Sequence, residues 1–420
     1  MQTYANVVSL AIPLFLVLIV IEYLISRYQG KNVLDSFDTI SSLSSGITNV
    51  IKDVLGLAVV IISYTWMVDH LALFSIENSI LIHVLAFIGL DFAGYWSHRF
   101  EHEINLLWNR HIIHHSSEEF NLACALRQSI SSVLSIFFFL YIPMAIIGIP
   151  SEVIAIVAPI HLFAQFWYHT RLIDKMGFLE YIIVTPSHHR VHHAINDKYL
   201  DKNFSQIFIV WDNLFGTFQE EIKSEPPVYG VKKQVNTWNP ILINFQHLTL
   251  MIKDFIHEAS FVERLKILFG PTGYRSQKNI KERPIEYTED AQSQIKYATT
   301  APAMIKVWCW VQLFIHLFFM IMMFQSLSDY GFMYILFYGA FIYLGVFSYT
   351  SFMDGSKMAI YSEILRHILS ITIVYLLESW FGSSIYLTSI VFVYLVFSTC
   401  ITIFFINKIT FPNERKFSTP

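Results

Sequence analysis

The sequence is poor in charge, because only 14% of its 420 residues are Asp, Glu, Lys or Arg. Soluble globular chains carry about 25% charged residues, so this shortage excludes an ordinary soluble domain. The formal net charge is only −4, and the chain has no excess of basic residues, which argues against nucleic acid as a partner. Hydrophobic residues make up 54% of the chain, with 37 Phe and 22 Tyr, as is typical of a protein that faces lipid.

Cysteine is also scarce. Cys124, Cys309 and Cys400 fall in or beside apolar segments and form no disulfide or zinc pattern, so we expect buried thiols. Histidine, by contrast, occurs 17 times, and the positions of these residues carry the functional argument.

Long apolar runs divide the chain. A helix needs about 20 apolar residues to cross roughly 30 Å of hydrocarbon. We identify nine candidate runs, at 5–26, 51–73, 80–97, 130–149, 152–170, 302–325, 331–352, 358–380 and 384–406. The first run lacks a basic leader and a small-residue cleavage site, so it is not a cleavable signal peptide. The sequence therefore predicts an all-α integral membrane protein with about nine transmembrane helices.

Lys and Arg are distributed unevenly between the two sides of these spans. The short connections near 70–79, 149–152, 326–331 and 381–384 contain none, whereas the long polar segments contain many. The positive-inside rule then places the N-terminus outside and a histidine-rich catalytic cap in the cytoplasm. We expect four regions: N-terminal transmembrane helices over 1–90, a histidine-box region with a transmembrane hairpin over 91–220, a cytoplasmic segment over 221–300, and a C-terminal transmembrane bundle over 301–420.

The histidines gather in three boxes. His98 and His102 are spaced i and i+4, so on a helix they share a face and can hold one metal. The pattern His-x-x-His-His then occurs twice, at 111–115 and 189–193. The eight predicted ligands are His98, His102, His111, His114, His115, His189, His192 and His193. Eight imidazoles are too many for one ion and suit two.

The ligand type alone does not select the metal, because neutral nitrogen suits iron, copper, zinc and nickel. A closed structural zinc site has four ligands and is often rich in Cys, which this lipid-facing pattern is not. The pattern fits an oxygen-activating diiron centre. His169, at the end of the fifth run, is a candidate ninth ligand, whereas we interpret His188 as a neighbouring or surface residue. We interpret the remaining histidines as structural: His70, His83, His161, His247, His257, His316 and His367.

Four polar residues near the boxes are candidate site residues. Asp91 lies two helical turns before His98 at membrane depth, where an acid is costly, so we expect it to fix the tautomer of a ligand imidazole. Glu103 either contacts a substrate or cosubstrate or is simply solvated. Arg127 and Gln128 begin the fourth run and are predicted to bind the head of a lipid, with a positive-inside anchor as the alternative for Arg127.

The three boxes, His-x3-His followed by two His-x2-His-His, resemble the fatty acid hydroxylase / sterol desaturase superfamily of integral-membrane diiron enzymes. The sequences at 98–108, 114–122, 125–129, 185–193, 201–203 and 211–217 look like its alkylglycerol monooxygenase branch. This similarity of motifs covers about residues 91–218.

The resemblance implies that O2 inserts one oxygen beside the ether oxygen of a glycerol ether lipid, giving a fatty aldehyde and glycerol. It also implies two Fe, and tetrahydrobiopterin as the reductant, with Asn121 at the catalytic site and Glu103 against the cofactor. Some superfamily members carry another His one turn before the residue that matches His169, where this chain has Gln165. The number of ligands therefore stays open at this point.

Two other functions remain open from the sequence. One is a hydroxylase or desaturase of a sterol, carotenoid or fatty acyl chain with a small electron-transfer protein as donor, which would use the same metal ligands. The other is a metal transporter, whose ligands should lie near the middle of the spans rather than at one edge.

Overall fold

The computed structural model describes residues 2–57 and 59–411. All regular elements in these ranges are helices, and the described residues form no strand, only four isolated bridges. The predicted all-α class is therefore confirmed.

Six helices in the described part of the chain are long and apolar enough to cross a membrane. They are α1 (Gln2–Tyr28), α4 (Ile80–Glu103), α14 (Ala303–Gln325), α15 (Phe332–Met353), α16 (Met358–Leu377) and α17 (Ile385–Phe405). Several begin at a capping side chain, as where Ser79 and Ser384 accept hydrogen bonds from the first turns of α4 and α17. The chain is therefore a multi-pass integral membrane protein.

Three of the nine predicted spans do not form long helices, so the number nine is wrong for these residues. In the run 51–73, helix α2 (Ser36–Val54) ends at Leu55, Gly56 adopts a positive φ of +63°, and only α3 (Tyr64–Leu71) follows. The run 130–149 yields a short 3-10 helix (Ile136–Tyr141) joined to α7 (Ile142–Ile147). The run 152–170 yields α8 (Ser151–Phe163), whose 13 residues are too few to span hydrocarbon.

The tight turn between the fourth and fifth runs is present, at 148–151. Gly148 has φ +89°, and a Cβ there would lie 2.0 Å from the carbonyl oxygen of Phe74. Only glycine can therefore occupy this turn, which places α7 and α8 next to α3.

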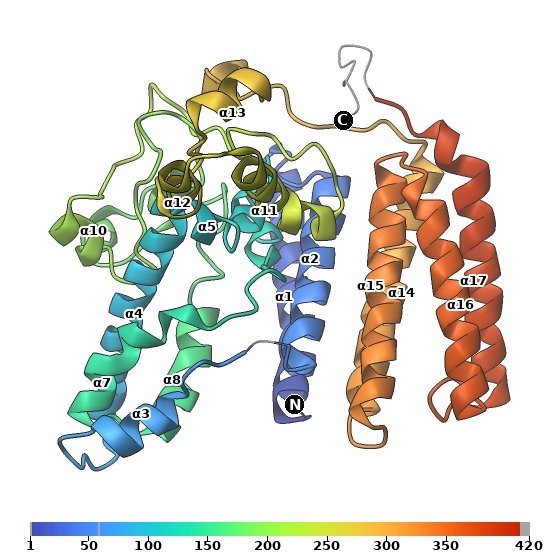
Figure 1. Cartoon of the computed structure of the whole chain (residues 1–420), viewed down its shortest axis with the longest axis horizontal. Coiled ribbons are helices and arrows are strands. Elements are labelled where there is room, and N and C mark those ends of the chain that lie inside the picture. Colours follow the sequence, from blue (N-terminus) through green and yellow to red (C-terminus); the bar gives the residue numbers. More distant parts are fainter. Residues whose placement is uncertain (1, 58, 412–420) are drawn as a thin grey trace.

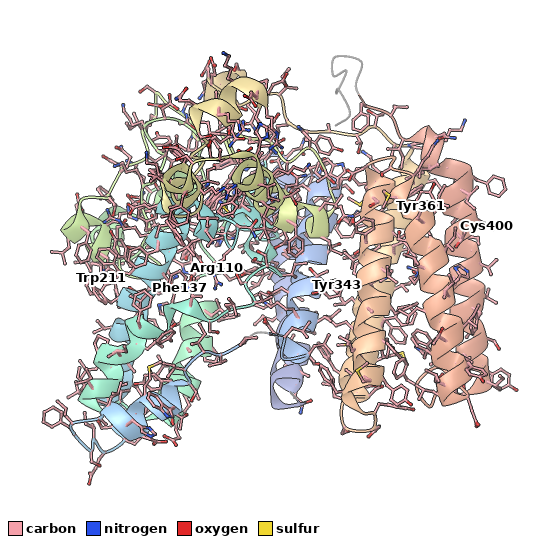
Figure 2. All side chains as sticks on the ribbon, viewed as in Figure 1. Arg110, Phe137, Trp211, Tyr343, Tyr361 and Cys400 are labelled. Atoms are coloured by element: carbon pink, nitrogen blue, oxygen red, sulfur yellow. The ribbon has the colours of Figure 1, made fainter. Side chains whose placement is uncertain are left out.

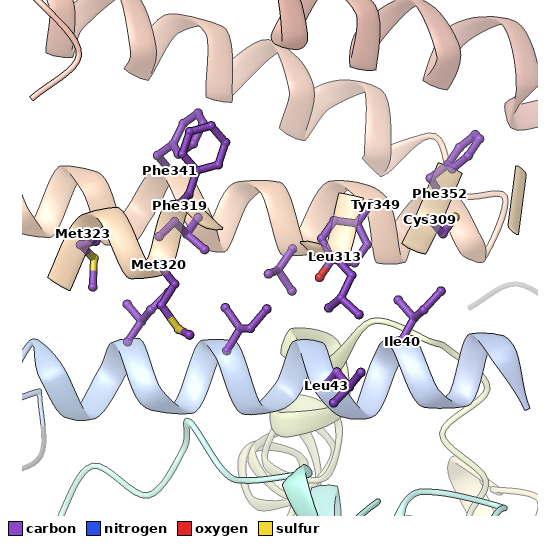
Figure 3. Close-up of a cluster of buried hydrophobic side chains, with 14 of the residues drawn as sticks. Ile40, Leu43, Cys309, Leu313, Phe319, Met320, Met323, Phe341, Tyr349 and Phe352 are labelled. Atoms are coloured by element: carbon purple, nitrogen blue, oxygen red, sulfur yellow. The ribbon is translucent and has the colours of Figure 1, made fainter. Parts of the chain in front are cut away.

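Helix α2 joins the two halves of the molecule. Asp35 caps its first turn by accepting hydrogen bonds from the backbone of Phe37 and Asp38. One face packs against α14 and α15, where Ile40 and Leu43 lie against apolar side chains such as Leu313 (Figure 3).

Hydroxyl groups strengthen this contact between α2 and α15. Ser44 and Tyr349 form a hydrogen bond of 2.6 Å, and Tyr343 donates to the carbonyl of Thr48 at 2.7 Å. Figure 2 places Tyr343 between α15 and the blue N-terminal helices.

The remaining helices form a cap at one end of the long helices, where α11, α12 and α13 gather (Figure 1). Its elements are α5 (Asn105–Trp108), α6 (Ile112–His115), α9 (Pro186–His192), α10 (Val210–Phe215), α11 (Pro240–His257), α12 (Phe261–Phe269) and α13 (Gln277–Glu282). Short 3-10 turns complete the chain at Cys124–Leu126, Gly177–Tyr181, Ala291–Ser293 and Ile406–Lys408. Helix α11 contacts α6, and α12 contacts α5, so the segment after residue 220 packs on the first histidine boxes.

Candidate metal centre

The three histidine boxes meet at the end of α4, together with His169 from the loop after α8. Their imidazoles form two groups, and within each group the ligand atoms all lie within 4.8 Å of one another. The first group is His98, His102, His111, His115 and His192, and the second is His114, His169, His189 and His193. The structure therefore brings together all eight predicted ligands and the candidate ninth. His188 belongs to neither group.

Each His-x-x-His-His box contributes to both groups rather than presenting one face to one ion. From the box at 111–115, His114 turns to the second group, and from the box at 189–193, His192 turns to the first. The boxes therefore interlock, so that the two groups are built from the same segments. The rings of His115 and His193 stack across the boundary with centroids 4.3 Å apart.

Imidazole nitrogens approach one another closely in both groups. The Nε2 atoms of His98 and His111 are 2.9 Å apart, and those of His102 and His115 are 3.1 Å apart. In the second group the Nε2 atom of His189 lies 2.8 Å from that of His169. Two nitrogens bound to one ion at about 2.0–2.1 Å lie roughly 2.9–3.4 Å apart, so these separations match shared coordination.

Carbonyl acceptors fix which nitrogen of each ring carries its proton. The Nδ1 atom of His98 donates to the carbonyl of Phe204 at 2.7 Å, and that of His192 donates to the carbonyl of Lys202 at 2.9 Å. A carbonyl can only accept, so the Nε2 atoms of these two rings hold bare lone pairs. Such backbone partners orient the ligand rings of metal sites.

The donors fit a pair of metal ions. The Nε2 atom of His192, which faces the first group, is buried and has no hydrogen-bond partner among the described residues, and such a buried lone pair is unfavourable unless an ion binds it. Burial and the neighbouring imidazoles lower the pKa of the grouped histidines outside the membrane helices, and lower that of His114 to about 3. Neutral imidazole is the form that binds metal. Neither group contains a carboxylate or a thiolate.

Asp91 does not contact a grouped histidine, contrary to our expectation. Its fully buried carboxylate accepts a hydrogen bond from Nε2 of His161 at 2.9 Å. It also accepts from the backbone of Ile207 and Phe208 and from the indole of Trp211. The acid therefore joins α4 to α8 and to the segment that precedes α10.

The link from Asp91 to the metal centre is indirect. His161 accepts a hydrogen bond at Nδ1 from the amide of Gln165, and the backbone carbonyl of Gln165 accepts one from Nδ1 of His169 at 3.1 Å. Asp91 thus supports His169 through two intermediate residues. His161 thus has a structural role, as predicted. Its partner could not be predicted, because the two residues are seventy positions apart and no local signal links them.

The guanidinium of Arg127 forms a buried ion pair, and the residue also lines the large cavity described below, so its contact with a lipid head stays a prediction. Its guanidinium donates to Asp38 at 2.6 Å and to the hydroxyls of Ser42 and Ser116, and it is 2% exposed. Its carbonyl accepts from Nδ1 of His114 at 3.3 Å. These contacts give Arg127 a supporting role beneath a metal ligand. Asp38 is a further supporting residue that the sequence analysis missed.

Two other predicted site residues lie outside the cavities at the metal centre. Glu103 is exposed and pairs with Arg99 at 2.8 Å on the surface of α4. Asn121 is fully buried, donates to the carbonyl of Val33 and accepts from two backbone amides of the following turn. Its amide therefore holds the loop after α6. Glu101 occupies the site instead, with Oε2 lying 3.6 Å from Nδ1 of His111.

A cavity of about 720 Å³ opens from the metal centre between α1, α2, α8 and α14. Histidines of both groups line its inner end, beside Glu101 and Arg110. Figure 2 shows Arg110 beside Phe137 below the cap, and the guanidinium lies 5.5 Å from that ring. The rest of the cavity, which we call its apolar arm, is lined mainly by apolar side chains: Val8, Ala11, Ile12, Phe15, Leu16, Leu43, Ile47, Leu162, Phe163, Phe166, Leu313, Phe314, Leu317 and Met320.

Polar side chains also line this cavity, and we call them its polar waist. Lys52 is 6% exposed and donates to Asn49 and to the carbonyl of Ser129, each at 3.0 Å, with Asp53 at 3.2 Å. Gln128 also lines the cavity and is exposed, and its contact with a lipid head stays a prediction. The cavity thus combines an apolar arm, a polar waist and a metal-binding end.

Comparisons with known proteins agree with this geometry. The fatty acid hydroxylase family model matches residues 83–217, which contain every grouped histidine. Human alkylglycerol monooxygenase is 32% identical over 368 residues, which cover 87% of this chain and 82% of that protein.

More limited matches involve other relatives. Alkylglycerol monooxygenase of Xenopus tropicalis is 38% identical over 261 residues, covering 62% of this chain and 58% of that protein. Ornithine lipid hydroxylase OlsE of Rhizobium tropici is 27% identical over 152 residues, or 36% of this chain and 46% of that protein. No solved structure matches the chain.

Proposed function

Since the chain belongs to the alkylglycerol monooxygenases and carries a fatty acid hydroxylase domain, we propose that it hydroxylates glycerol ether lipids. The carbon next to the ether oxygen is the site of reaction, and a fatty aldehyde and glycerol are the products. The observation that carries this proposal is the cavity of about 720 Å³, which connects five of the nine grouped histidines to an apolar arm among membrane helices.

The cavity suits a long-chain ether lipid in each of its three parts. The arm between α1 and α14 removes an alkyl chain from water, which contributes about 0.8 kcal/mol for each buried CH2. Lys52, Asn49 and Gln128 at the waist offer donors and acceptors to glycerol hydroxyls. The ether oxygen between chain and head then lies toward the histidines.

The overall reaction balances with tetrahydrobiopterin as the two-electron donor. One oxygen atom of O2 enters the C–H bond beside the ether oxygen, and the other leaves as water with two hydrogens from the pterin, which becomes a dihydropterin. The resulting hemiacetal breaks its C–O bond to glycerol, whose oxygen takes the hemiacetal proton. The nine histidines would hold a pair of irons, which would supply the activation of O2.

The residues of this chain position the substrate and keep the site in order. The carbonyls of Phe204, Lys202 and Gln165 hold three ligand rings, as described above. The apolar arm excludes water from the reacting carbon, which limits side reactions. The predicted roles of Glu103 and Asn121 remain predictions, since neither side chain lines a cavity at the metal centre.

We further propose that the cap and the metal centre lie on the cytoplasmic side. The predicted cytoplasmic segments contain nearly all of the Lys and Arg residues between the spans, and the short opposite connections contain none. A water-soluble reductant then reaches the centre from the cytoplasm, while the lipid enters from the bilayer.

The test is fatty aldehyde formation by the purified, iron-loaded enzyme in detergent. We expect aldehyde from an alkylglycerol only when both O2 and tetrahydrobiopterin are present, and none from the matching acylglycerol, which lacks the ether CH2. Leu317→Trp fills the apolar arm and should raise KM at least tenfold, whereas Phe318→Trp on the exposed side of α14 should not. Turnover that needs an iron–sulfur or cytochrome partner and ignores pterin would contradict the proposed donor.

A further inference from the structure

A second cavity, of about 360 Å³, reaches the metal centre from the cap. His102, His115 and His192 line it, whereas His98 and His111 of the same group line the lipid cavity. The two cavities have no lining residue in common. The first histidine group is therefore approached from two separate sides.

The outer wall of the second cavity comes from the cap segment after residue 220. The residues 230–235, the middle of α11, the turn at 272–275 and Tyr287 form this wall. All of them lie outside the residues matched by the fatty acid hydroxylase model, 83–217. The second cavity is thus an addition to the shared histidine core, and it gives the segment 221–300 a place in the active site.

Aromatic rings line the cavity next to the ligands. The Trp108 ring centroid lies 4.9 Å from that of His102 and 5.4 Å from that of His115. Tyr287, from the cap segment, also lines the cavity and is 43% exposed. Flat surfaces of this kind suit a planar ring system, because aromatic contacts favour stacked and edge-on arrangements.

The charged groups of the cavity include one cation without a partner. Asp254 is already bound by Arg275 through two hydrogen bonds, and Lys232 pairs with Asp197 at 2.6 Å. For Lys233, by contrast, no ion pair or hydrogen bond is formed with any side chain in the described residues. Burial and the nearby charge of Arg275 lower the pKa of this half-buried amine. An oxygen acceptor in the cavity would satisfy it.

We infer that this second cavity is the binding site of the reduced pterin, on its own side of the metal centre. The inference rests on the proposed function and names where its electron donor binds. The volume falls in the range of small-molecule pockets, roughly 300–1,000 Å³. Trp108 provides the surface against which the pterin ring packs beside His102 and His115, and Lys233 donates to the ring carbonyl oxygen.

The walls also favour a small polar ligand over a lipid or a docked protein. Of the residues that line the cavity, only His102 belongs to a long apolar helix, so a bilayer lipid has no apolar path into it. The ligand histidines form part of its lining, so a molecule in it contacts them directly. A pterin meets both conditions, because it is compact, planar and rich in donors and acceptors.

The experiment measures binding rather than turnover. Tetrahydrobiopterin is kept reduced under nitrogen and equilibrated by dialysis against the full-length enzyme in detergent. Lys233→Met should raise its Kd about tenfold or more, as expected for the loss of a charged donor. Leu250→Trp, which fills the cavity from α11, should abolish binding. Both variants should retain wild-type metal content and wild-type affinity for alkylglycerol.

Matched controls separate the cavity from general damage. Lys198→Met removes an exposed lysine that pairs weakly with Glu225, and Leu242→Trp enlarges an exposed position of the same α11 helix. Both should bind the pterin as the wild type does. If Lys233→Met and Leu250→Trp also keep the wild-type Kd, the pterin binds elsewhere and the inference is wrong. A wild-type enzyme that does not bind the pterin would instead overturn the donor in the proposed function.

Discussion

Two buried polar clusters in this protein both contain histidine, yet they are constructed in opposite ways. At the metal centre, the lone pairs of His98, His192 and their neighbours converge with no proton donor between them. In the C-terminal bundle, His316 is fully buried between α14, α15 and α16 and has a partner at each nitrogen.

The histidine of the C-terminal cluster is paired with a charged neighbour. Nδ1 of His316 donates to the carbonyl of Gln312 at 2.7 Å, and Arg366 donates to Nε2 at 3.3 Å. Arg366 also lies 3.2 Å from the carboxylate of Glu363, which accepts from Ser348 at 2.7 Å. Paired charges of this kind fix how helices pack within a membrane.

The comparison shows that burial of a histidine does not identify a ligand, whereas the group that faces its second nitrogen does. At His316 that group is a guanidinium, which excludes a metal ion by charge. At His98 it is another imidazole nitrogen 2.9 Å away. Substitutions at the metal centre should therefore affect activity and metal content, whereas substitutions in the C-terminal cluster should affect stability.

The largest effect is expected from His192→Ala, which removes a ligand whose Nε2 atom has no other partner. Activity should fall at least about a thousandfold and the metal content should fall with it, because ligand loss opens the first site. Metal analysis and aldehyde formation measure the two effects. The exposed His257→Ala serves as the control and should retain both. Full metal content and activity in His192→Ala would contradict the ligand assignment.

Acid should affect the metal centre next. Burial lowers the pKa of the grouped histidines in the cap, so they are neutral when folded, whereas an unfolded histidine titrates near 6.5. Their contribution to the free energy of unfolding is fully present above about pH 6.5. It is lost as the pH falls below that value, toward the folded-state pKa, which is about 3 for His114. At pH 5.5 each such histidine lowers the free energy of unfolding by up to about 1.4 kcal/mol.

Measurements of metal content and thermal unfolding between pH 7.5 and 5.5 test whether the metal centre is destabilised by acid. Metal should dissociate progressively on the acid side, with the helical content of the membrane bundle still intact. A metal content that increases toward pH 5.5 would show that the folded histidines are not held neutral.

The C-terminal cluster should respond in stability rather than chemistry. Arg366→Leu leaves Glu363 buried without its cation, which costs about 3–5 kcal/mol by the precedent of broken buried pairs. Thermal unfolding in detergent should show this loss, while the folded fraction keeps wild-type metal content. The double variant Arg366→Leu/Glu363→Leu should recover part of the stability. Loss of metal in the folded fraction would show that the two clusters are coupled.

The smallest effect is expected at the waist of the lipid cavity. Gln128→Ala removes an exposed amide that we assign to the glycerol head, while leaving every ligand in place. One neutral hydrogen bond is worth about 0.5–1.5 kcal/mol, so KM for alkylglycerol should rise roughly two- to tenfold with kcat and metal content unchanged. An unchanged KM would remove Gln128 from the substrate site.

The sequence predicted the ligands well because their spacing is a local signal. The i, i+4 pair in α4 and the two His-x-x-His-His boxes identified eight of the nine grouped histidines, and His169 was the candidate ninth. The division into two interlocked groups could not be predicted, since it depends on how α6 and α9 face each other. That arrangement is set by contacts between distant segments.

The supporting residues were harder to predict for the same reason. Asp91 was expected to contact a ligand on its own helix, but its partner His161 comes from α8. Arg127 was expected to bind the head of a lipid, but its buried ion pair with Asp38 of α2 could not be predicted. Spacing along one helix does not show which distant side chain fills the space beside a charge.

Hydropathy predicted the C-terminal helices together with α1 and α4, and it failed for three runs of the N-terminal half. The four runs after residue 300 became α14 to α17, where the apolar pattern is continuous. Helix α2 was missed because its serines read as polar, although they are buried against α15 and the 3-10 turn at Cys124–Leu126. The run 51–73 was wrongly predicted to be one transmembrane helix, because Gly56 and the turn that follows interrupt it.

The small size of the apolar clusters around the histidines has a further consequence. The main hydrophobic core joins α2 to the C-terminal bundle, whereas the cap contains only groups of three such as Val191, Ala194 and Tyr199. Ions bound there would act as cross-links, tying four chain segments together much as disulfides tie a small secreted domain. Chelation should therefore make the cap accessible to proteases and leave the C-terminal bundle resistant. The catalytic end of the molecule would then fold completely only after its metals bind.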